Sequence, residues 1–185
     1  MAHVTIAIAS CGRSSLADTL ASIEAQAVPE AWTVEVVVAD DSLDGSAAAI
    51  TKDAGMSVPV QVIAVASRNI AQARNACLDA ARGEYIIFVD DDEIVGPAWI
   101  HHLVEDARRT GADCLFAPVQ PEYGPHAPAW IVALNPLFPS EVRTARRGDV
   151  IVGRTGNSLL KRAFVERHAL RFDVSFGTGV EDLHF

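Results

Sequence analysis

The sequence predicts an α/β fold built on a mostly parallel sheet. Three observations support this: apolar runs alternate with helical patterns along residues 4–119, most runs are apolar at nearly every position, and two of them end in acidic clusters. A strand that is apolar throughout is typical of a parallel sheet covered on both faces. Strands that alternate with helices indicate crossover connections, which place the strands side by side and parallel.

The elements of the first half can be placed in order along the chain. Ser15 and Asp18 resemble a capping box that opens the first helix, and Pro97 suits the first turn of a later one. Gly55 and Gly83 suit the ends of helices. The expected strands are 4–9, 34–39, 60–65, 85–89 and 112–119, and the expected helices begin near residues 15, 44, 69 and 97.

The second half, residues 120–185, departs from this alternation. Five prolines between residues 120 and 139 predict a long loop with one helical turn near Trp130. Residues 149–152 and 158–161 are expected to be strands, and 162–168 a short helix. We therefore expect one domain of 185 residues with a small antiparallel part after residue 119, and the apolar and acidic end at 179–185 suggests a truncated chain.

Composition and charge exclude several classes of function. The formal net charge of −9 argues against a nucleic-acid surface, which is basic. No apolar run approaches the ~18 residues of a membrane span, and the first strand is too short and lacks the basic flank of a signal peptide. The cysteines are few and widely spaced, which fits reduced thiols in the cytoplasm better than a zinc site or a disulfide framework: Cys11, Cys77 and Cys114.

Acidic side chains follow two predicted strands where those strands end. Asp40 and Asp41 follow the second strand, and residues 90–92 are three aspartates after the fourth. Open α/β sheets bind ligands in the crevice at these ends. Three carboxylates there repel one another unless a cation lies among them, and Mg²⁺ is held by carboxylates and phosphates. With Arg74 as a planar fork for a phosphate or a carboxylate, the residues point to a nucleotide diphosphate held by a cation.

Each of these residues also has a purely structural interpretation. The acids at 40–41 could be first-turn residues favoured by a helix dipole, and Arg74 could form a surface ion pair. Residues 90–92 could be a solvated acidic turn. These alternatives stay open for any one motif taken alone.

Taken together, five motifs resemble those of the family 2 glycosyltransferases, which have the GT-A fold. One motif is weak evidence, but five in the family's order and spacing are strong evidence. They are Ser10–Arg13, of which only Arg13 matches the family's aromatic-Asn-Arg turn; 40–46, one residue shorter than Asp-Asp-Gly-Ser-Thr-Asp; 69–75, similar to Asn-x-Gly-x-x-x-Ala-Arg-Asn; 84–92, close to Glu-Tyr-Ile-x-Phe-Leu-Asp-x-Asp; and 179–182, similar to the Glu-Asp motif. The run 155–157 looks most like exopolysaccharide-type members.

This resemblance implies roles for the residues that bind a donor. Asp41, with Asp40 as the alternative, would contact the uracil ring of a UDP-sugar, and Arg74 would support the base or the phosphates. Asp90 would face the ribose or sugar and take part in the metal site, and Asp92 would bind Mn²⁺ or Mg²⁺. Residues 1–119 would thus form the nucleotide-sugar-binding half of the domain, and the remainder would be part of an acceptor and catalytic half.

The resemblance also implies a catalytic pair and further donor contacts. Asp182 would be the general base of an inverting transfer, and Glu181 would help to place the acceptor. Ser10, Asp91 and Asn157 complete the expected nucleotide-sugar-binding set. The acceptor would be a saccharide or a lipid-linked saccharide, reached in the cytoplasm or by peripheral association with the inner face of the plasma membrane. The sequence indicates neither the donor sugar nor an oligomeric state.

Two other functions remain open at this stage. A non-catalytic module that binds nucleotide-sugars would keep Asp41, Arg74 and Asp92 but transfer nothing. A Mg²⁺-dependent phosphohydrolase would want an aspartate nucleophile after the first strand, where this chain has Ser10 and Cys11. Metal-dependent release of UDP from UDP-sugars, with and without a saccharide acceptor, distinguishes the three.

Overall fold

The computed structural model describes residues 1–135, 143–144 and 150–177. Its strands are β1 (His3–Ser10), β2 (Thr33–Asp40), β3 (Val60–Ala64), β4 (Tyr85–Phe88), β5 (Cys114–Phe116), β6 (Arg143–Thr144), β7 (Val150–Val152) and β8 (Ser158–Lys161). Its helices are α1 (Leu16–Glu24), α2 (Ser46–Asp53), α3 (Ile70–Ala80), α4 (Trp99–Thr110), α5 (Ala129–Leu134), α6 (Arg162–His168) and the 3₁₀ turn η1 (Val174–Phe176).

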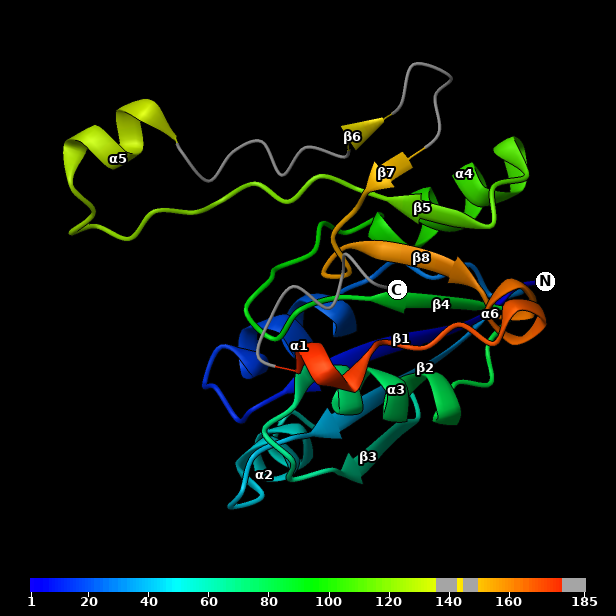
Figure 1. Cartoon of the computed structure of the whole chain (residues 1–185), viewed down its shortest axis with the longest axis horizontal. Coiled ribbons are helices and arrows are strands. Elements are labelled where there is room, and N and C mark those ends of the chain that lie inside the picture. The colour runs from blue at the N-terminus through cyan, green and yellow to red at the C-terminus, as the bar shows by residue number, and fades with distance from the viewer. Residues whose placement is uncertain (136–142, 145–149, 178–185) are drawn as a thin grey trace.

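The main sheet has the strand order β3-β2-β1-β4-β8-β5. Strands β1 to β4 are parallel, which confirms the predicted fold class. The sequence did not indicate where β8 would lie: it is antiparallel to both β4 and β5 and separates them, as Figure 1 shows. The expected strand 112–119 is reduced to β5, because the chain leaves the sheet beyond the short stretch that pairs with β8.

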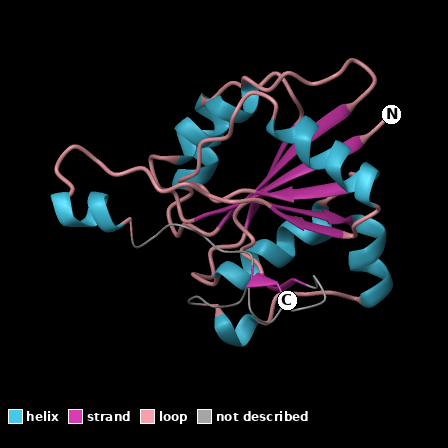
Figure 2. Cartoon of the chain, turned by 90° about the horizontal axis from the view of Figure 1, so that it is seen from above, coloured by secondary structure: helices cyan, strands magenta, loops and turns pink. Residues whose placement is uncertain are grey.

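Helices cover both faces of this sheet, so the core has two layers (Figure 2). One layer packs α1, α2 and α4 against alternate strand residues such as Ile6 and Ile87, and the other packs α3 and α6 against residues such as Ala7 and Phe88. The alternation follows from the two-residue period of a strand. In β8, Leu159 belongs to the first layer and Leu160 to the second, so this strand joins both.

Two expected helix ends are wrong in detail. Ser15 already has helical backbone angles (φ −58°, ψ −24°) and its side chain caps nothing, because a capping residue needs an extended backbone. Asn69 has that extended backbone at the start of α3, where its side chain accepts from Gln72 N at 3.0 Å. Gly83 is not the end of α3, which stops at Ala80; a Cβ on Gly83 would come within 2.5 Å of the backbone of Thr5 in β1.

The second half follows the expected elements where it is described. The predicted helical turn near Trp130 is α5, which lies away from the sheet at the end of a long loop (Figure 1). Strand β8 and helix α6 have the predicted bounds. No helix in the described ranges is long and apolar enough to cross a membrane. The expected catalytic pair, Glu181 and Asp182, lies outside the described residues.

Candidate functional site

The carboxylate of Asp41 lies at the end of β2 and is held by the loop that follows β3. Its Oδ1 accepts hydrogen bonds from Ser67 N at 2.6 Å, Ser67 Oγ at 2.9 Å and Arg68 N at 2.8 Å. Ala66 and Arg68 adopt left-handed backbone angles, with φ of 50° and 54°, which are unfavourable for non-glycine residues. Within the described chain nothing donates to Oδ2, so Asp41 presents one oriented acceptor.

Both oxygens of the neighbouring Asp40 carboxylate accept hydrogen bonds from the chain. Its Oδ1 accepts from the backbone and hydroxyl of Ser42, and its Oδ2 accepts from Ala48 N in the first turn of α2 at 2.9 Å. Asp40 is therefore a residue that fastens the start of α2 to the end of β2. Of the two acids that the sequence left as alternatives, the geometry favours Asp41 as the one that meets a ligand.

Ser10 and Asp91 join the ends of β1 and β4. Ser10 Oγ donates to Asp91 Oδ2 at 2.6 Å, and Arg13 Nη1 lies 3.2 Å from Asp91 Oδ1 and 2.9 Å from Asp92 Oδ2. The pKa of Asp91 is raised, chiefly by burial, although the Ser10 hydrogen bond and the Arg13 charge act to lower it. Asp91 thus ties the end of β4 to the end of β1 through Ser10. The side chain of Asp92 is 53% exposed and faces solvent with Arg13 beside it.

Arg74 lies beneath this acidic edge on helix α3. Its side chain is only 4% exposed, and Nη2 donates to Asp90 Oδ1 at 3.0 Å. The guanidinium also lies over the ring of Phe172, 5.6 Å from its centroid. Arg74 is therefore not the surface ion pair that its place on a helix allowed. It orients Asp90, whose side chain is 41% exposed.

Glu93 and Gly156 meet at the side of β4 that faces β8. A Cβ atom on Gly156 would lie 2.4 Å from Asp90 Oδ2 and 2.9 Å from Glu93 Oε1, so the bare glycine backbone packs on both carboxyl groups. Burial, followed by the charge of Asp90, raises the pKa of Glu93 to about 8. The sequence interpretation gave Glu93 no role. The only signal for it was its position directly after the three aspartates.

Asn157 anchors the segment that carries Gly156. Its Oδ1 accepts from Trp99 Nε1 at 2.7 Å, and its Nδ2 donates to Pro118 O at 3.1 Å. Both ends of the amide are thus used to fix the chain between α4 and the loop after β5. The expected contact of Asn157 with a nucleotide-sugar stays a prediction.

Residues 171–177 lie along α3 and approach its N-terminus. Asn75 and Phe172 exchange two hydrogen bonds of 2.9 Å each, from Asn75 Nδ2 to Phe172 O and from Phe172 N to Asn75 Oδ1. Asn69 Nδ2 donates to Val174 O at 2.9 Å, and Ile70 N donates to Gly177 O at 3.1 Å. The run 69–75 that resembled a family motif therefore binds Asp90 through Arg74 and this segment through its two asparagines.

The acidic edge suits a divalent cation in its chemistry. The described residues contain no group of three or more His, Cys, Asp or Glu side chains arranged to hold a metal. However, Asp90 Oδ2 and Glu93 Oε1 converge at Gly156, and Asp92 lies close by in the sequence. Mg²⁺ is commonly held by one or two carboxylates with phosphate oxygens and water completing the set. The donors present therefore fit an ion that arrives with a diphosphate.

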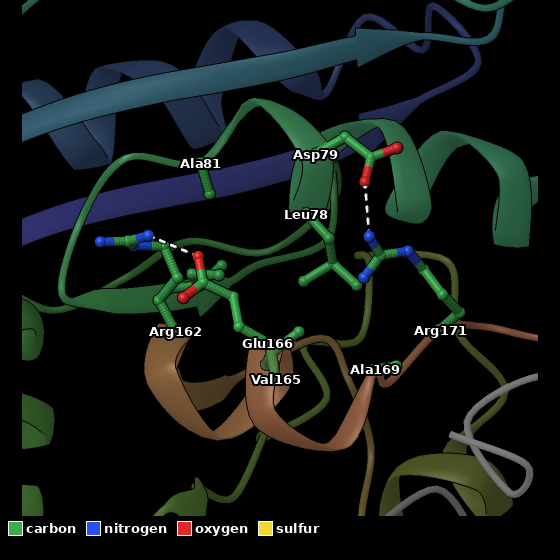
Figure 3. A pocket seen from close by; sticks show the side chains of 9 residues that line it. Leu78, Asp79, Ala81, Arg162, Val165, Glu166, Ala169 and Arg171 are labelled. Carbon is green, nitrogen blue, oxygen red and sulfur yellow. Dashed lines mark hydrogen bonds and ion pairs between the residues drawn. The ribbon is translucent and has the colours of Figure 1, made fainter.

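A separate hollow of about 330 Å³ lies near the amino-terminal end of β4 (Figure 3). It lies between α3 and α6, and its walls carry two ion pairs, Arg162–Glu166 and Arg171–Asp79. None of the residues that the sequence analysis assigned to the site lines it. The lining residues are Leu78, Asp79, Ala81, Ile86, Arg162, Val165, Glu166, Ala169 and Arg171.

Comparison with known proteins agrees with the sequence motifs and with the fold. The family described as Glycosyl transferase family 2 matches residues 5–168. The chain is 37% identical over 186 residues to the succinoglycan biosynthesis protein ExoM of Rhizobium meliloti (strain 1021). The alignment covers 99% of this chain and 60% of that protein, so the chain spans somewhat more than half the length of this relative.

Solved structures share the same fold at low sequence identity. S. aureus TarS 1–349 in complex with UDP-GlcNAc is 20% identical with a TM-score of 0.76, over 99% of this chain and 51% of that one. The mannosyltransferase PcManGT from Pyrobaculum calidifontis, in complex with GDP-Man and Mn²⁺, is 20% identical with a TM-score of 0.70, over 99% of this chain and 50% of that one. On its sequence match, the chain belongs to glycosyltransferase family 2.

Proposed function

We propose that this chain is the donor-binding part of a metal-dependent, inverting glycosyltransferase. It would move a sugar from a UDP-sugar to a saccharide or lipid-linked saccharide in polysaccharide biosynthesis, at the cytoplasmic side of the membrane. One observation carries the proposal: an oriented acceptor on Asp41, buried Arg74 and the carboxylates of residues 90–93 lie along one edge of the sheet. That edge is where parallel sheets bind nucleotides.

The donor would lie across the strand ends in the order of the sheet. Uracil N3–H would donate to Asp41 Oδ2 at β2, and the ribose and diphosphate would cross β1 toward Asp90 at β4. The ends of β2 and β4 are two strand spacings apart, roughly 10 Å. Arg13 and Arg74 supply fixed positive charges for an anionic ligand on a chain whose net charge is −9.

Asp92 and Asp90 would hold Mn²⁺ or Mg²⁺, which offsets the charge of the leaving diphosphate when bound. Asp92 Oδ2 is already paired with Arg13, and within the described residues no hydrogen bond reaches Oδ1. Asp182 would accept the proton of the acceptor hydroxyl while Glu181 places the acceptor. A base on one side and a leaving group on the other allow a single in-line displacement, which inverts the anomeric carbon.

The similar proteins support this proposal through what their names and complexes state. ExoM is described as a succinoglycan biosynthesis protein, which agrees with a polysaccharide product. TarS is complexed with UDP-GlcNAc, and PcManGT with GDP-Man and Mn²⁺. The choice of UDP over GDP for this chain rests on the resemblance of residues 40–46 to the family motif, because guanine N1–H could also donate to a carboxylate such as Asp41. Cytoplasmic location and membrane association belong to the proposal.

The test is release of UDP from UDP-glucose, UDP-galactose and UDP-GlcNAc with Mn²⁺, with Mg²⁺ or with EDTA, with and without saccharide acceptors. We expect release that needs the metal and is faster with an acceptor. Release of inorganic phosphate would instead support a phosphohydrolase. Binding of UDP-sugars with no release under any condition would favour the non-catalytic module.

The Asp92→Ala variant tests the metal ligand. Loss of its carboxylate is expected to abolish the increase in UDP affinity that Mn²⁺ causes, as measured by isothermal titration calorimetry. The matched control is Asp113→Ala. It removes a carboxylate that is paired with Lys161 at the opposite end of the strands. If Mn²⁺ strengthens UDP binding equally in Asp92→Ala and in the wild type, Asp92 is not a ligand.

The Asp182→Asn variant tests the general base. Asparagine keeps the size of the side chain and removes the proton acceptor. Because general base catalysis typically contributes ~10²–10⁴-fold, transfer to a saccharide should fall by about that factor while the Kd of UDP stays unchanged. Undiminished transfer in this variant would move the assignment to Glu181.

A further inference from the structure

We propose that Asn69 and Gly177 form a clamp that positions the catalytic pair for the transfer step. The clamp holds segment 171–177 against the N-terminus of α3, and residues 181–182 follow shortly after this segment in the sequence. This inference rests on the proposed function, in which residues 181–182 are the catalytic pair. It adds two positioning residues that act through the chain rather than on the substrate.

The side-chain amide of Asn69 serves two elements at once. Its Oδ1 accepts from Gln72 N at 3.0 Å and caps α3, and its Nδ2 donates to Val174 O at 2.9 Å. Aspartate caps a helix about as well as asparagine does, but a carboxylate has no hydrogen to donate to a carbonyl oxygen. The asparagine is therefore needed by the segment and not by the helix.

Gly177 lies directly against this amide. A Cβ atom on Gly177 would overlap Cγ and Nδ2 of Asn69, and Ile70 N donates to Gly177 O at 3.1 Å. The φ of Gly177 is −64°, which any residue adopts, so the glycine is needed for the close approach and not for the backbone conformation. The chain is thus fixed to α3 a few residues before the catalytic pair.

The same helix also fixes an acid of the proposed donor site. Arg74 on α3 donates to Asp90 Oδ1 at 3.0 Å, and its guanidinium lies over the ring of Phe172 in the segment. Phe172 is buried, and its ring meets that of Phe88 edge-on with the centroids 5.7 Å apart. Helix α3 is therefore a common frame for a donor acid and for the segment that leads to the catalytic pair.

The length of chain between the clamp and the proposed base makes this frame matter for catalysis. Asp182 is five residues beyond Gly177 in the sequence, and five residues of extended chain span at most about 18 Å. In-line displacement needs the base and the leaving group in register, and a misplacement of about 1 Å can cost ~10²-fold in rate. Loss of the clamp is therefore expected to slow transfer while the donor acids keep their places.

The Asn69→Asp variant tests the clamp while it keeps the cap of α3. We expect kcat for transfer from a UDP-sugar to a saccharide acceptor to fall tenfold or more, and the Kd of UDP with Mn²⁺ to stay within twofold of the wild type. Gln72→Glu is the matched control, because it makes the same change from amide to carboxylate at an exposed position in the first turn of α3. This control should change neither quantity.

The Gly177→Ala variant tests the same contact from the other side. Its methyl group would push the segment away from the Asn69 amide, so kcat should fall while the Kd of UDP stays unchanged. Gly124→Ala, whose Cβ would meet nothing within 4 Å, should leave both quantities as in the wild type. Circular dichroism and thermal melting establish that each variant is folded, so a loss of kcat alone reports positioning rather than stability.

The outcomes separate this inference from the proposed function. If the wild type transfers sugar from none of the UDP-sugars, the proposed function fails. If the wild type transfers sugar and a folded clamp variant keeps its kcat, or loses UDP affinity together with kcat, the clamp does not position the catalytic pair and the proposed function stands.

Discussion

The chain holds one carboxylate oxygen of Asp41, and in the proposed function the other oxygen would accept a hydrogen bond from the ligand. In Asp41→Asn, the three donors from Ser67 and Arg68 would still bond the amide oxygen, so the NH₂ group would take the place of Oδ2. Uracil N3–H would then meet a donor, and the Kd of UDP is expected to rise about 10–100-fold. CDP, whose ring nitrogen accepts, should lose less affinity. Calorimetry with both nucleotides measures the change.

The melting temperature serves as the control for this variant. Because the loop after β3 keeps its hydrogen bonds, Asp41→Asn should melt close to the wild type, and the exposed Asp18→Asn should change neither property. Equal UDP affinity in Asp41→Asn and the wild type would remove β2 from the nucleotide site.

Glu93 makes the stability of the ligand-free protein depend on pH. Its pKa is about 8 in the folded chain against 4.5 ordinarily, so the folded state holds this proton more tightly than the unfolded state. Its contribution to the free energy of unfolding is therefore full below about pH 4.5 and falls as the pH rises to about 8. Glutamine mimics the neutral form, so Glu93→Gln should be more stable than the wild type at pH 8.5 but not at pH 4.5.

Urea denaturation at both pH values, in the presence of EDTA, measures this difference. Each unit of pKa shift corresponds to about 1.4 kcal/mol, which sets the scale of the gain at high pH. A difference between Glu93→Gln and the wild type that is the same at pH 4.5 and pH 8.5 contradicts the shift.

At this scale the sequence indicated candidate residues but not all of the contacts that hold them, and the reason is physical. The candidates Asp41 and Asp90 could be named because strand ends in a parallel sheet share one edge, and Arg74 could be named for its planar guanidinium. The contact between Glu93 and Gly156 could not be predicted, since Gly156 lies just before β8, a strand whose place in the sheet no local pattern specifies. The bonds of Asn157 to Trp99 and Pro118 could not be predicted either, because nothing in the sequence marks these distant partners.

Among the elements, α3 and the segment 171–177 are joined by side-chain hydrogen bonds as well as by apolar packing. In Asn75→Ala, the backbone N–H and C=O of Phe172 would each lose the hydrogen bond that Asn75 supplies. A lost hydrogen bond costs roughly 0.5–1.5 kcal/mol, so the free energy of unfolding should fall by about 1–3 kcal/mol in denaturant titrations.

A neighbouring contact of the same two elements provides the comparison. Arg171 and Asp79 form an exposed ion pair at 2.8 Å, and pairs of that kind contribute about 0–1 kcal/mol. Arg171→Ala should therefore cost far less than Asn75→Ala. Equal losses in the two variants would mean that the Asn75 bonds to Phe172 do not hold the segment.

The elements themselves were largely predictable, and their ends were not. Apolar periodicity gave β1, β2 and β4 almost to the residue, because their burial on both faces leaves a continuous apolar run. The expected capping box at Ser15 failed because a turn from Arg13 leads straight into α1, with Leu16 N bonded to Arg13 O at 3.1 Å. The position of such a turn depends on where β1 ends, and the capping-box pattern carries no information about that position.

For the whole molecule, the two expected halves share one sheet. Strand β8 comes from the second half, yet it pairs with β4 and β5 of the first and contributes to both layers of the core. Without β8, β5 would lose its neighbour and β4 one of its two. A chain of residues 1–119 should therefore show no cooperative unfolding transition by circular dichroism, whereas the 185-residue chain should show one.

A sharp transition in the 1–119 chain would contradict this view and would make the first half a domain of its own. The sequence predicted the parallel direction of the strands from the crossover helices that join them. It could not predict the place of β8, because an antiparallel strand arriving after a long proline-rich loop carries no crossover pattern that fixes its neighbour.

The place of β8 also sets the order of events during synthesis. Tyr85 in β4 pairs with Lys161, so the partner of β4 leaves the ribosome more than 70 residues later. At ~5–20 residues per second, β4 waits roughly 4–15 s with an unpaired apolar edge. Contacts so far apart in the chain form slowly, and an open edge of this kind can pair with another chain. Nascent chains of this protein are therefore expected to need chaperones most between the emergence of β4 and that of β8.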